Sequence, residues 1–202
     1  MKMLYVTDRA AIGNTAFART LDALAGSPGL LVQLREKQAP DREVLKRARA
    51  AREKLGPDVL FVNSRFDVAL AAGAAGVHLP AAGLPLDRVR SHTPRGFRIG
   101  VSTHAPEEAR EAIAAGADLV VIGPTFDTPS KRGQGPPLGV RALEALPPIR
   151  EHGAAVFAIG GIDESRLPDF EPYTDRISGI AAVRLFQEAG DPRAVAERIA
   201  QR

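Results

Sequence analysis

Short apolar stretches recur along the chain, and they are separated by longer segments in which apolar and polar residues alternate with a helical period. There are eight such stretches, each rich in β-branched or aliphatic residues, as expected for buried strands. They are MLYVT (3–7), LLVQL (30–34), VLFVN (59–63), GVHL (76–79), RIGVS (98–102), DLVVIG (118–123), AAVFAIG (154–160) and SGIAAV (178–183).

Segments of helical periodicity lie between most of these strands. The clearest are 41–55, 64–73, 105–116 and 191–202, each bounded by a plausible capping residue or a terminal glycine. Strands that alternate with helices pair in parallel and have their faces covered by those helices. Eight units predict a single (β/α)8 barrel spanning residues 1–202, and a doubly wound open sheet is the alternative with the same alternation.

The composition is that of an ordinary globular protein and excludes several kinds of site. The 202 residues suffice for one sizeable core, and the chain is 45% hydrophobic and 25% charged. The absence of cysteine excludes disulfides, thiolate metal sites and cysteine nucleophiles. The net charge of +3 comes with only 5% aromatic residues and scattered arginines, so we expect no nucleic-acid partner.

The sequence also predicts no membrane segment. The apolar run at the start, MKMLYVTDRA, is too short for a signal peptide, and no stretch approaches the roughly 20 apolar residues of a membrane span. We therefore expect a soluble, cytoplasmic protein.

Residues 121–135, VIGPTFDTPSKRGQG, form the most unusual stretch of the chain. Prolines and glycines prevent helix or sheet there, while hydroxyl and cationic side chains are concentrated in it, among them Thr128, Ser130 and Lys131. The stretch follows the sixth predicted strand, and the loops after barrel strands carry the active site. It is interpreted as an anion-binding loop, with a solvated surface loop as the alternative.

A second anion site is predicted where the seventh and eighth strands end. The backbone N–H groups of Gly160, Gly161, Ala182 and Val183 lie at these ends, where barrels frequently hold phosphate. A plain tight turn is the alternative for the two glycines.

The stretch QLREK places cations at the end of the second strand. Alternation along a strand puts Gln33, Arg35 and Lys37 on one side, facing the barrel mouth if Leu34 packs against the helices. Two cations are too costly to bury unpaired, so they predict either carboxylate partners or an anionic ligand.

Other polar groups fall at neighbouring strand ends. Asn63, His78 and Ser102 are candidate mouth residues by the same alternation, although each alone is also typical of a cap or a satisfied interior group. His104, just after the fifth strand, is the other titratable candidate.

Several of these segments together resemble the thiamine phosphate synthase and TenI superfamily. The similar segments are VQLREK, VNSRFDVALAAGAAGVHLP, GVSTHAPEEAREAIAAGADLVVIGPTFDTPSKRG and FAIGGI, in this order from about Leu4 to Phe186. The resemblance implies a (β/α)8 barrel, a ligand of the thiamin pathway that carries phosphate, and often a homodimer. It also implies that the hydroxyls and the lysine of the T-x-S-K segment contact pyrophosphate.

The chain departs from the synthase branch at the two magnesium ligands that the resemblance implies. Ser64 stands where an aspartate is expected, and the segment after His78 offers no carboxylate before Asp87, with Gly83 near the second position. Mg²⁺ prefers oxygen ligands, usually one or two carboxylates beside substrate phosphate. We therefore expect no metal and no cofactor, and Mg²⁺ only if the chain is a synthase after all.

The combination of NSR with HLP resembles the TenI branch, whose tautomerases shift a proton within a thiazole carboxylate phosphate. The favoured hypothesis is therefore a thiazole tautomerase, an isomerase. The histidine of that branch is replaced here by Pro124, so the acid-base group would be His78 or His104. A thiamine phosphate synthase, a transferase, and a non-catalytic binder of thiazole phosphate are the alternatives.

Overall fold

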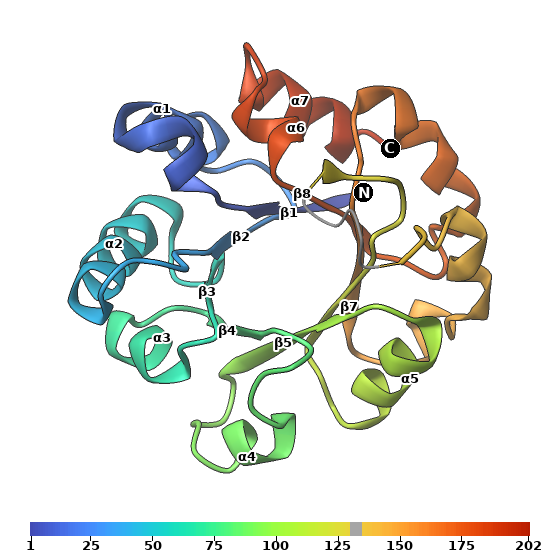
Figure 1. The fold of residues 1–202 in the computed structure, drawn as a ribbon, viewed down its shortest axis with the longest axis horizontal. Coiled ribbons are helices and arrows are strands. Elements are labelled where there is room, and N and C mark those ends of the chain that lie inside the picture. The colour runs from blue at the N-terminus through green and yellow to red at the C-terminus, as the bar shows by residue number, and fades with distance from the viewer. Residues whose placement is uncertain (130–134) are drawn as a thin grey trace.

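The strands close into a parallel barrel (Figure 1). The computed structural model describes residues 1–129 and 135–202, and in it each strand pairs with the next while β8 pairs with β1. The predicted (β/α)8 barrel is confirmed, and the open-sheet alternative is wrong. The strands are β1 (Lys2–Val6), β2 (Leu30–Leu34), β3 (Leu60–Asn63), β4 (Gly76–Leu79), β5 (Arg98–Thr103), β6 (Leu119–Ile122), β7 (Ala155–Ile159) and β8 (Gly179–Ala182).

Helices surround the barrel, and they are α-helices except before β7 and β8. The α-helices are α1 (Arg9–Leu24), α2 (Asp41–Leu55), α3 (Phe66–Ala72), α4 (Leu86–Arg90), α5 (Pro106–Ala114), α6 (Arg184–Gln187) and α7 (Pro192–Ala200). The connections to β7 and β8 contain the 3-10 helices η2 (Val140–Ala145), η3 (Ile149–Glu151) and η4 (Glu164–Tyr173) instead. In η4, Pro168 and Pro172 lack the N–H groups that an α-helix requires.

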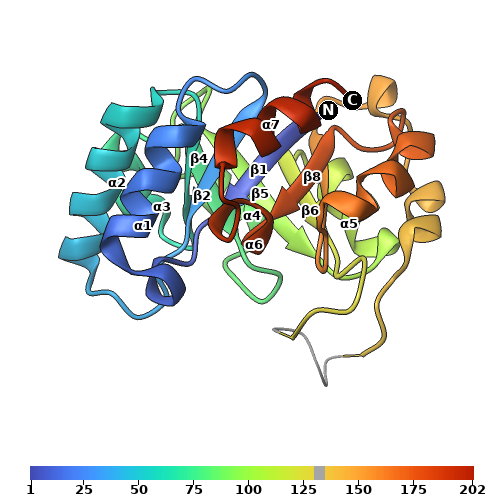
Figure 2. The ribbon, with the colours of Figure 1, turned by 90° about the horizontal axis from the view of Figure 1, so that it is seen from above.

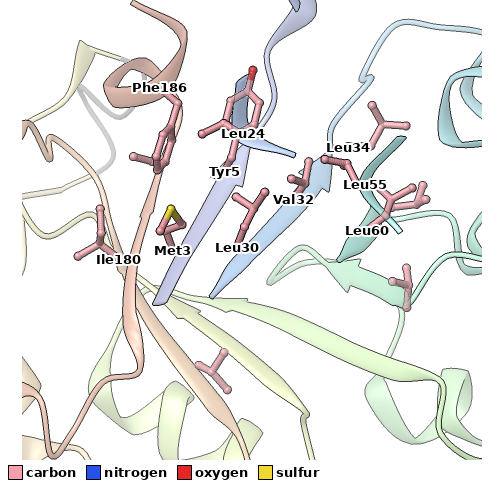
Figure 3. Close-up of a cluster of buried hydrophobic side chains, with 14 of the residues drawn as sticks. Met3, Tyr5, Leu24, Leu30, Val32, Leu34, Leu55, Leu60, Ile180 and Phe186 are labelled. Atoms are coloured by element: carbon pink, nitrogen blue, oxygen red, sulfur yellow. The ribbon is translucent and has the colours of Figure 1, made fainter. Parts of the chain in front are cut away.

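The hydrophobic core has two layers. The outer layer lies between strands and helices, where side chains such as Leu24 on α1 and Leu55 on α2 pack against β1, β2 and β3 (Figure 3). The inner layer fills the barrel and comprises Leu4, Val6, Phe61, Leu119, Val121, Phe157 and Ala181. Because a packed interior leaves no channel, a ligand can bind only at an end of the barrel.

The two ends of the barrel differ. Both termini lie at one end, and the described parts of the long connection after β6 extend beyond the other end, where the strands finish (Figure 2). This second end is the one that carries active sites in (β/α)8 barrels, and we call it the mouth. In the described part of the chain, no helix combines the length and the apolar character needed to cross a bilayer.

Candidate active site

The last inward-facing position of four consecutive strands is polar. Gln33, Asn63, His78 and Ser102 occupy it on β2, β3, β4 and β5. Their strand neighbours belong to the outer hydrophobic layer, for example Val62 beside Asn63 and Val77 beside His78. These four side chains therefore lie on the inward face that strand alternation predicts.

Hydrogen bonds join the four side chains in two pairs. The amide Nε2 of Gln33 donates to Oδ1 of Asn63 at 2.8 Å, and Nδ2 of Asn63 donates to Oγ of Ser64 at 2.8 Å. Nε2 of His78 lies 2.8 Å from Oγ of Ser102, within hydrogen-bond distance. Asn63 and Ser102 are only half-buried, whereas Gln33 and His78 are buried beneath them. A ligand in the mouth would therefore reach the amide of Asn63 and the hydroxyl of Ser102 first.

His78 is a neutral interior group. Its exposed fraction is 1%, and burial lowers its pKa to about 4. Gly100 provides the space for the ring, because a Cβ at that position would lie 2.7 Å from Nδ1 of His78. Nδ1 has no hydrogen-bond partner among the described residues. At neutral pH this imidazole can orient the Ser102 hydroxyl, and it has a low affinity for a proton.

The other half of the mouth is apolar in its side chains. Val6 on β1, Val121 on β6, Ile159 on β7 and Val183 after β8 belong to the inner hydrophobic layer or pack against it. At these strand positions a polar ligand can therefore be bound only by backbone groups.

Backbone donors are available where β7 and β8 end. Gly160 and Gly161 have φ of 108° and 63°, a region that favours glycine. Among the described residues, the N–H groups of Gly160, Gly161 and Val183 donate to no backbone carbonyl. Ile159 on β7 pairs with Ala181 on β8, so the two turns are neighbours and can offer several donors to one anion. Ala182 is the last residue of β8 and is buried. Binding of an anion at these turns stays a prediction.

The connection after β6 packs directly on the β7 turn. The N–H groups of Thr125 and Phe126 donate to the carbonyls of Ile159 and Gly160 at 2.7 and 2.9 Å. A Cβ on Gly160 would lie 2.7 Å from Cα of Pro124. Thr128 is buried in this connection. Ser130 and Lys131 lie outside the described residues, so their predicted ligand contacts stay predictions.

Arg35 and Lys37 follow β2 at the rim of the mouth. Arg35 is half-buried and Lys37 is exposed, and neither forms an ion pair within residues 1–129 and 135–202. Of the two outcomes predicted for these cations, carboxylate partners are not observed among the described residues. Binding of an anionic ligand by Arg35 and Lys37 stays a prediction. The carboxylate between them, Glu36, is engaged with Arg9 and Arg47 instead.

His104 is not part of the mouth layer. The His104 side chain is 45% exposed, and the backbone N–H of His104 donates to Oε2 of Glu108 on α5 at 2.7 Å. It therefore lies in the short connection between β5 and α5.

Sequence reasoning missed Thr7 and Gly100. Thr7 follows β1, is fully buried, and its Oγ1 accepts a hydrogen bond from the N–H of Arg35 at 2.9 Å. A polar residue ending an apolar stretch was the signal that identified Asn63, and it applies equally to Thr7. For Gly100 the sequence carries no comparable signal, because its role depends on the position of His78.

Gln33, Asn63, His78 and Ser102 form the polar layer of the mouth. The described residues offer few other places for a catalytic site. The described residues contain no group of three or more His, Cys, Asp or Glu side chains arranged to hold a metal ion. A hollow of about 410 Å³ lies at the opposite end of the barrel, between residues that precede or begin strands, such as Lys2, Ala155 and Ser178. The polar layer of the mouth is therefore our candidate active site.

Proteins similar to this chain include two named thiamine-phosphate synthase and one named thiamine phosphate pyrophosphorylase. A Methanoculleus marisnigri protein named thiamine-phosphate synthase is 39% identical over 206 residues, covering 98% of this chain and 94% of that protein. A Gloeobacter violaceus protein of the same name is 46% identical over 164 residues, and the match spans 80% of this chain but only 47% of that protein. The solved structure of a thiamine phosphate pyrophosphorylase from Pyrococcus furiosus is 27% identical, with a TM-score of 0.81 over 99% of this chain and 94% of that one.

These relatives overturn the favoured hypothesis of the sequence analysis. The tautomerase hypothesis is wrong, because the relatives are named synthases or pyrophosphorylase rather than tautomerases. It rested on Ser64 and the missing carboxylate after His78, two positions that do not outweigh similarity over the whole chain. The proton-carrier roles of His78 and His104 belonged to that hypothesis and are withdrawn with it.

A family model described as thiamine monophosphate synthase matches residues 3–186. The match runs from the first strand to the short helix after the last one, so it includes every strand end that forms the mouth. The chain belongs to the thiamine monophosphate synthase family.

Proposed function

We propose that this chain is a thiamine-phosphate synthase, a transferase that joins a pyrimidine pyrophosphate to a thiazole phosphate. The coupling replaces the bond between the pyrimidine methylene carbon and pyrophosphate by a bond to the thiazole, and pyrophosphate leaves. The observation that carries the proposal is the family match over residues 3–186, together with relatives of the same name that cover nearly the whole chain.

The two halves of the mouth support a division of the two substrates. The backbone donors of Gly160, Gly161 and Val183 suit the terminal phosphate of the thiazole, since they need no counter-charge from a side chain. Asn63 and Ser102 can donate to and accept from the ring of the pyrimidine. We assign Arg35 and Lys37 to its pyrophosphate.

The residues present do not fit the magnesium site that the family resemblance implies. Ser64 offers a hydroxyl that already accepts a hydrogen bond from Asn63, and Gly83 offers no side-chain oxygen. These two positions therefore provide no carboxylate ligand for Mg²⁺ during the coupling. What the chain does supply near the pyrophosphate is the positive charge of Arg35 and Lys37, which stabilises a leaving group as it gains negative charge.

The same departure favours a second candidate function, a non-catalytic binder of thiazole phosphate. Such a protein would retain the backbone donors at the ends of β7 and β8 and would not need the groups that activate pyrophosphate.

Incubation of the pure protein with both substrates tests the proposal. We expect thiamine phosphate and pyrophosphate to form in equal amounts, in reactions run in parallel with Mg²⁺ and with a chelator. We expect addition of Mg²⁺ to raise the rate less than tenfold, because the protein carboxylates that would hold the ion are missing. No product under either condition, with thiazole phosphate still bound, would instead support the binder.

A further inference from the structure

The segment Arg35-Glu36-Lys37 alternates two cations with one carboxylate at the rim of the mouth. A free Glu36 would be a neighbour of both cations and would compete with an anionic ligand for them. In the structure the Glu36 carboxylate is paired with Arg9 and Arg47. The inference drawn from these contacts rests on the proposed function.

Hydrogen bonds to Thr7, the residue after β1, hold the backbone of this segment in place. The N–H of Arg35 donates to Oγ1 of Thr7 at 2.9 Å, and the N–H of Thr7 donates to the carbonyl of Gln33 at 3.0 Å. Thr7 is fully buried, so these bonds are shielded from water. The direction in which Arg35 leaves β2 is therefore set by two reciprocal bonds to the neighbouring strand end.

The side chain of Glu36 is held on the other side of the chain. Nε and Nη2 of Arg9 donate to its two carboxylate oxygens at 2.8 and 3.1 Å. Nη1 of Arg47 lies 3.5 Å from Oε2, and the Glu36 side chain is only 5% exposed. Paired hydrogen bonds of this kind fix the plane of a carboxylate as well as its position.

The two arginines come from different helices. Arg9 begins α1, in the short turn before the break at Gly13, and Arg47 lies in the middle of α2. These helices are neighbours on the outside of the barrel (Figure 1). Glu36 therefore connects the rim of the mouth to the helical layer, and its charge is offset by two cations that belong to that layer.

We infer that Glu36 is a positioning residue: held by Arg9 and Arg47, it keeps Arg35 and Lys37 unpaired and directed toward the pyrophosphate of the substrate. Arg9 and Arg47 serve the same purpose without touching the ligand. The segment thus keeps its positive charge available at the mouth although it contains a carboxylate.

The substitution Glu36→Gln distinguishes this role from a simple charge effect by the sign of its result. If Glu36 were only a nearby negative charge, its removal would strengthen the binding of an anion. Loss of the positioning contacts predicts the opposite. We expect the Kd of inorganic pyrophosphate, measured by calorimetry on the full chain, to rise at least tenfold.

Glu164→Gln is the matched control. Glu164 accepts two hydrogen bonds from Arg198 at 2.8 and 2.9 Å, but this pair joins η4 to α7 on the outside of the barrel. We expect its pyrophosphate Kd to stay within twofold of the wild type. An unchanged or tighter Kd in Glu36→Gln would overturn the inference, and so would unchanged binding in Arg35→Met.

Kinetics separate positioning from general damage to the fold. In Glu36→Gln we expect the KM for the pyrimidine pyrophosphate to rise about tenfold and the KM for thiazole phosphate to change less than twofold. Equal rises in both would contradict the inference. If Glu36→Gln does not fold, Arg47→Met keeps the Arg9 contacts and should raise the pyrophosphate Kd about threefold. The binding measurement needs no turnover, so a chain that binds pyrophosphate as predicted but forms no product would refute only the proposed function.

Discussion

The two halves of the barrel mouth are built on different chemical principles. On β2 to β5 the last inward positions carry polar side chains, such as Asn63 and Ser102, and hydrogen bonds run between neighbouring strands. On β6 to β8 and β1 the same positions are apolar, and the polar groups offered to a ligand are backbone N–H groups at Gly160, Gly161 and Val183. The first half depends on residue type, and the second depends on backbone conformation.

This difference determines how each half should respond to substitution. A side-chain site loses one contact when one residue changes, and its neighbours can adjust. A backbone site requires a particular φ at each glycine, and here a neighbouring loop packs against the same positions. We therefore expect the backbone half to tolerate much less change than the side-chain half.

The largest effect should follow from Gly160→Ala. The φ of 108° is strained for any residue with a Cβ, and that Cβ would lie 2.7 Å from Cα of Pro124. We expect the Kd of thiazole phosphate to rise at least tenfold, and the free energy of unfolding to fall by about 3 kcal/mol. Calorimetry and urea denaturation measure these two quantities.

Gly190→Ala is the control for this prediction. A Cβ on Gly190 would meet nothing within 4 Å beyond its chain neighbours, and the residue has no positive φ, so both quantities should stay near the wild type. If Gly160→Ala behaved like Gly190→Ala, the backbone half would not depend on its glycines.

A smaller effect should appear in the side-chain half as a pH dependence of stability. Burial lowers the pKa of His78 to about 4, so this side chain stays unprotonated in the folded protein at pH 5 to 6 while the unfolded chain takes up a proton. Stability therefore falls as the pH drops below the unfolded value of about 6.5. Between pH 7.5 and 4.5 the protonation of this group in the unfolded chain should lower the free energy of unfolding by roughly 2 to 3 kcal/mol.

Urea denaturation of wild type and His78→Gln at both pH values isolates this contribution. Over that interval, the free energy of unfolding should fall by roughly 2 to 3 kcal/mol more in the wild type than in His78→Gln. His92→Gln is the control, because His92 is exposed on the protein surface and should leave the wild-type dependence nearly unchanged. Equal losses in wild type and His78→Gln would mean that His78 is not a buried neutral group.

The sequence predicted the side-chain half better than the backbone half. Period-2 alternation placed Gln33, Asn63, His78 and Ser102 on the inward face, and the structure agrees. Alternation predicts which face of a strand a side chain lies on, but not how deeply it is buried. The burial of His78 could therefore not be predicted from it. The ion pairs of Glu36 with Arg9 and Arg47 were also not predictable, because the two arginines come from two other elements.

For the backbone half, the sequence identified the glycines and the strand ends, but not the contact between them and the β6 connection. That contact joins segments distant in the sequence, around Thr125 and Gly160, and depends on the φ of Gly160 and Gly161. The predicted tautomerase function was wrong for a different reason. It depended on two substituted positions, Ser64 and the one near Gly83, whereas relatives named synthase are similar over nearly the whole chain. The predicted homodimer stays a prediction.

A crystal structure with thiazole phosphate and inorganic pyrophosphate bound together tests the division of the mouth most directly. The account predicts two separate anions. The thiazole phosphate should lie on the N–H groups of Gly160, Gly161 and Val183, and the pyrophosphate should lie beside Arg35 and Lys37. Both anions in one half of the mouth, or either of them in the hollow beside Lys2 and Ser178 at the opposite end, would contradict it.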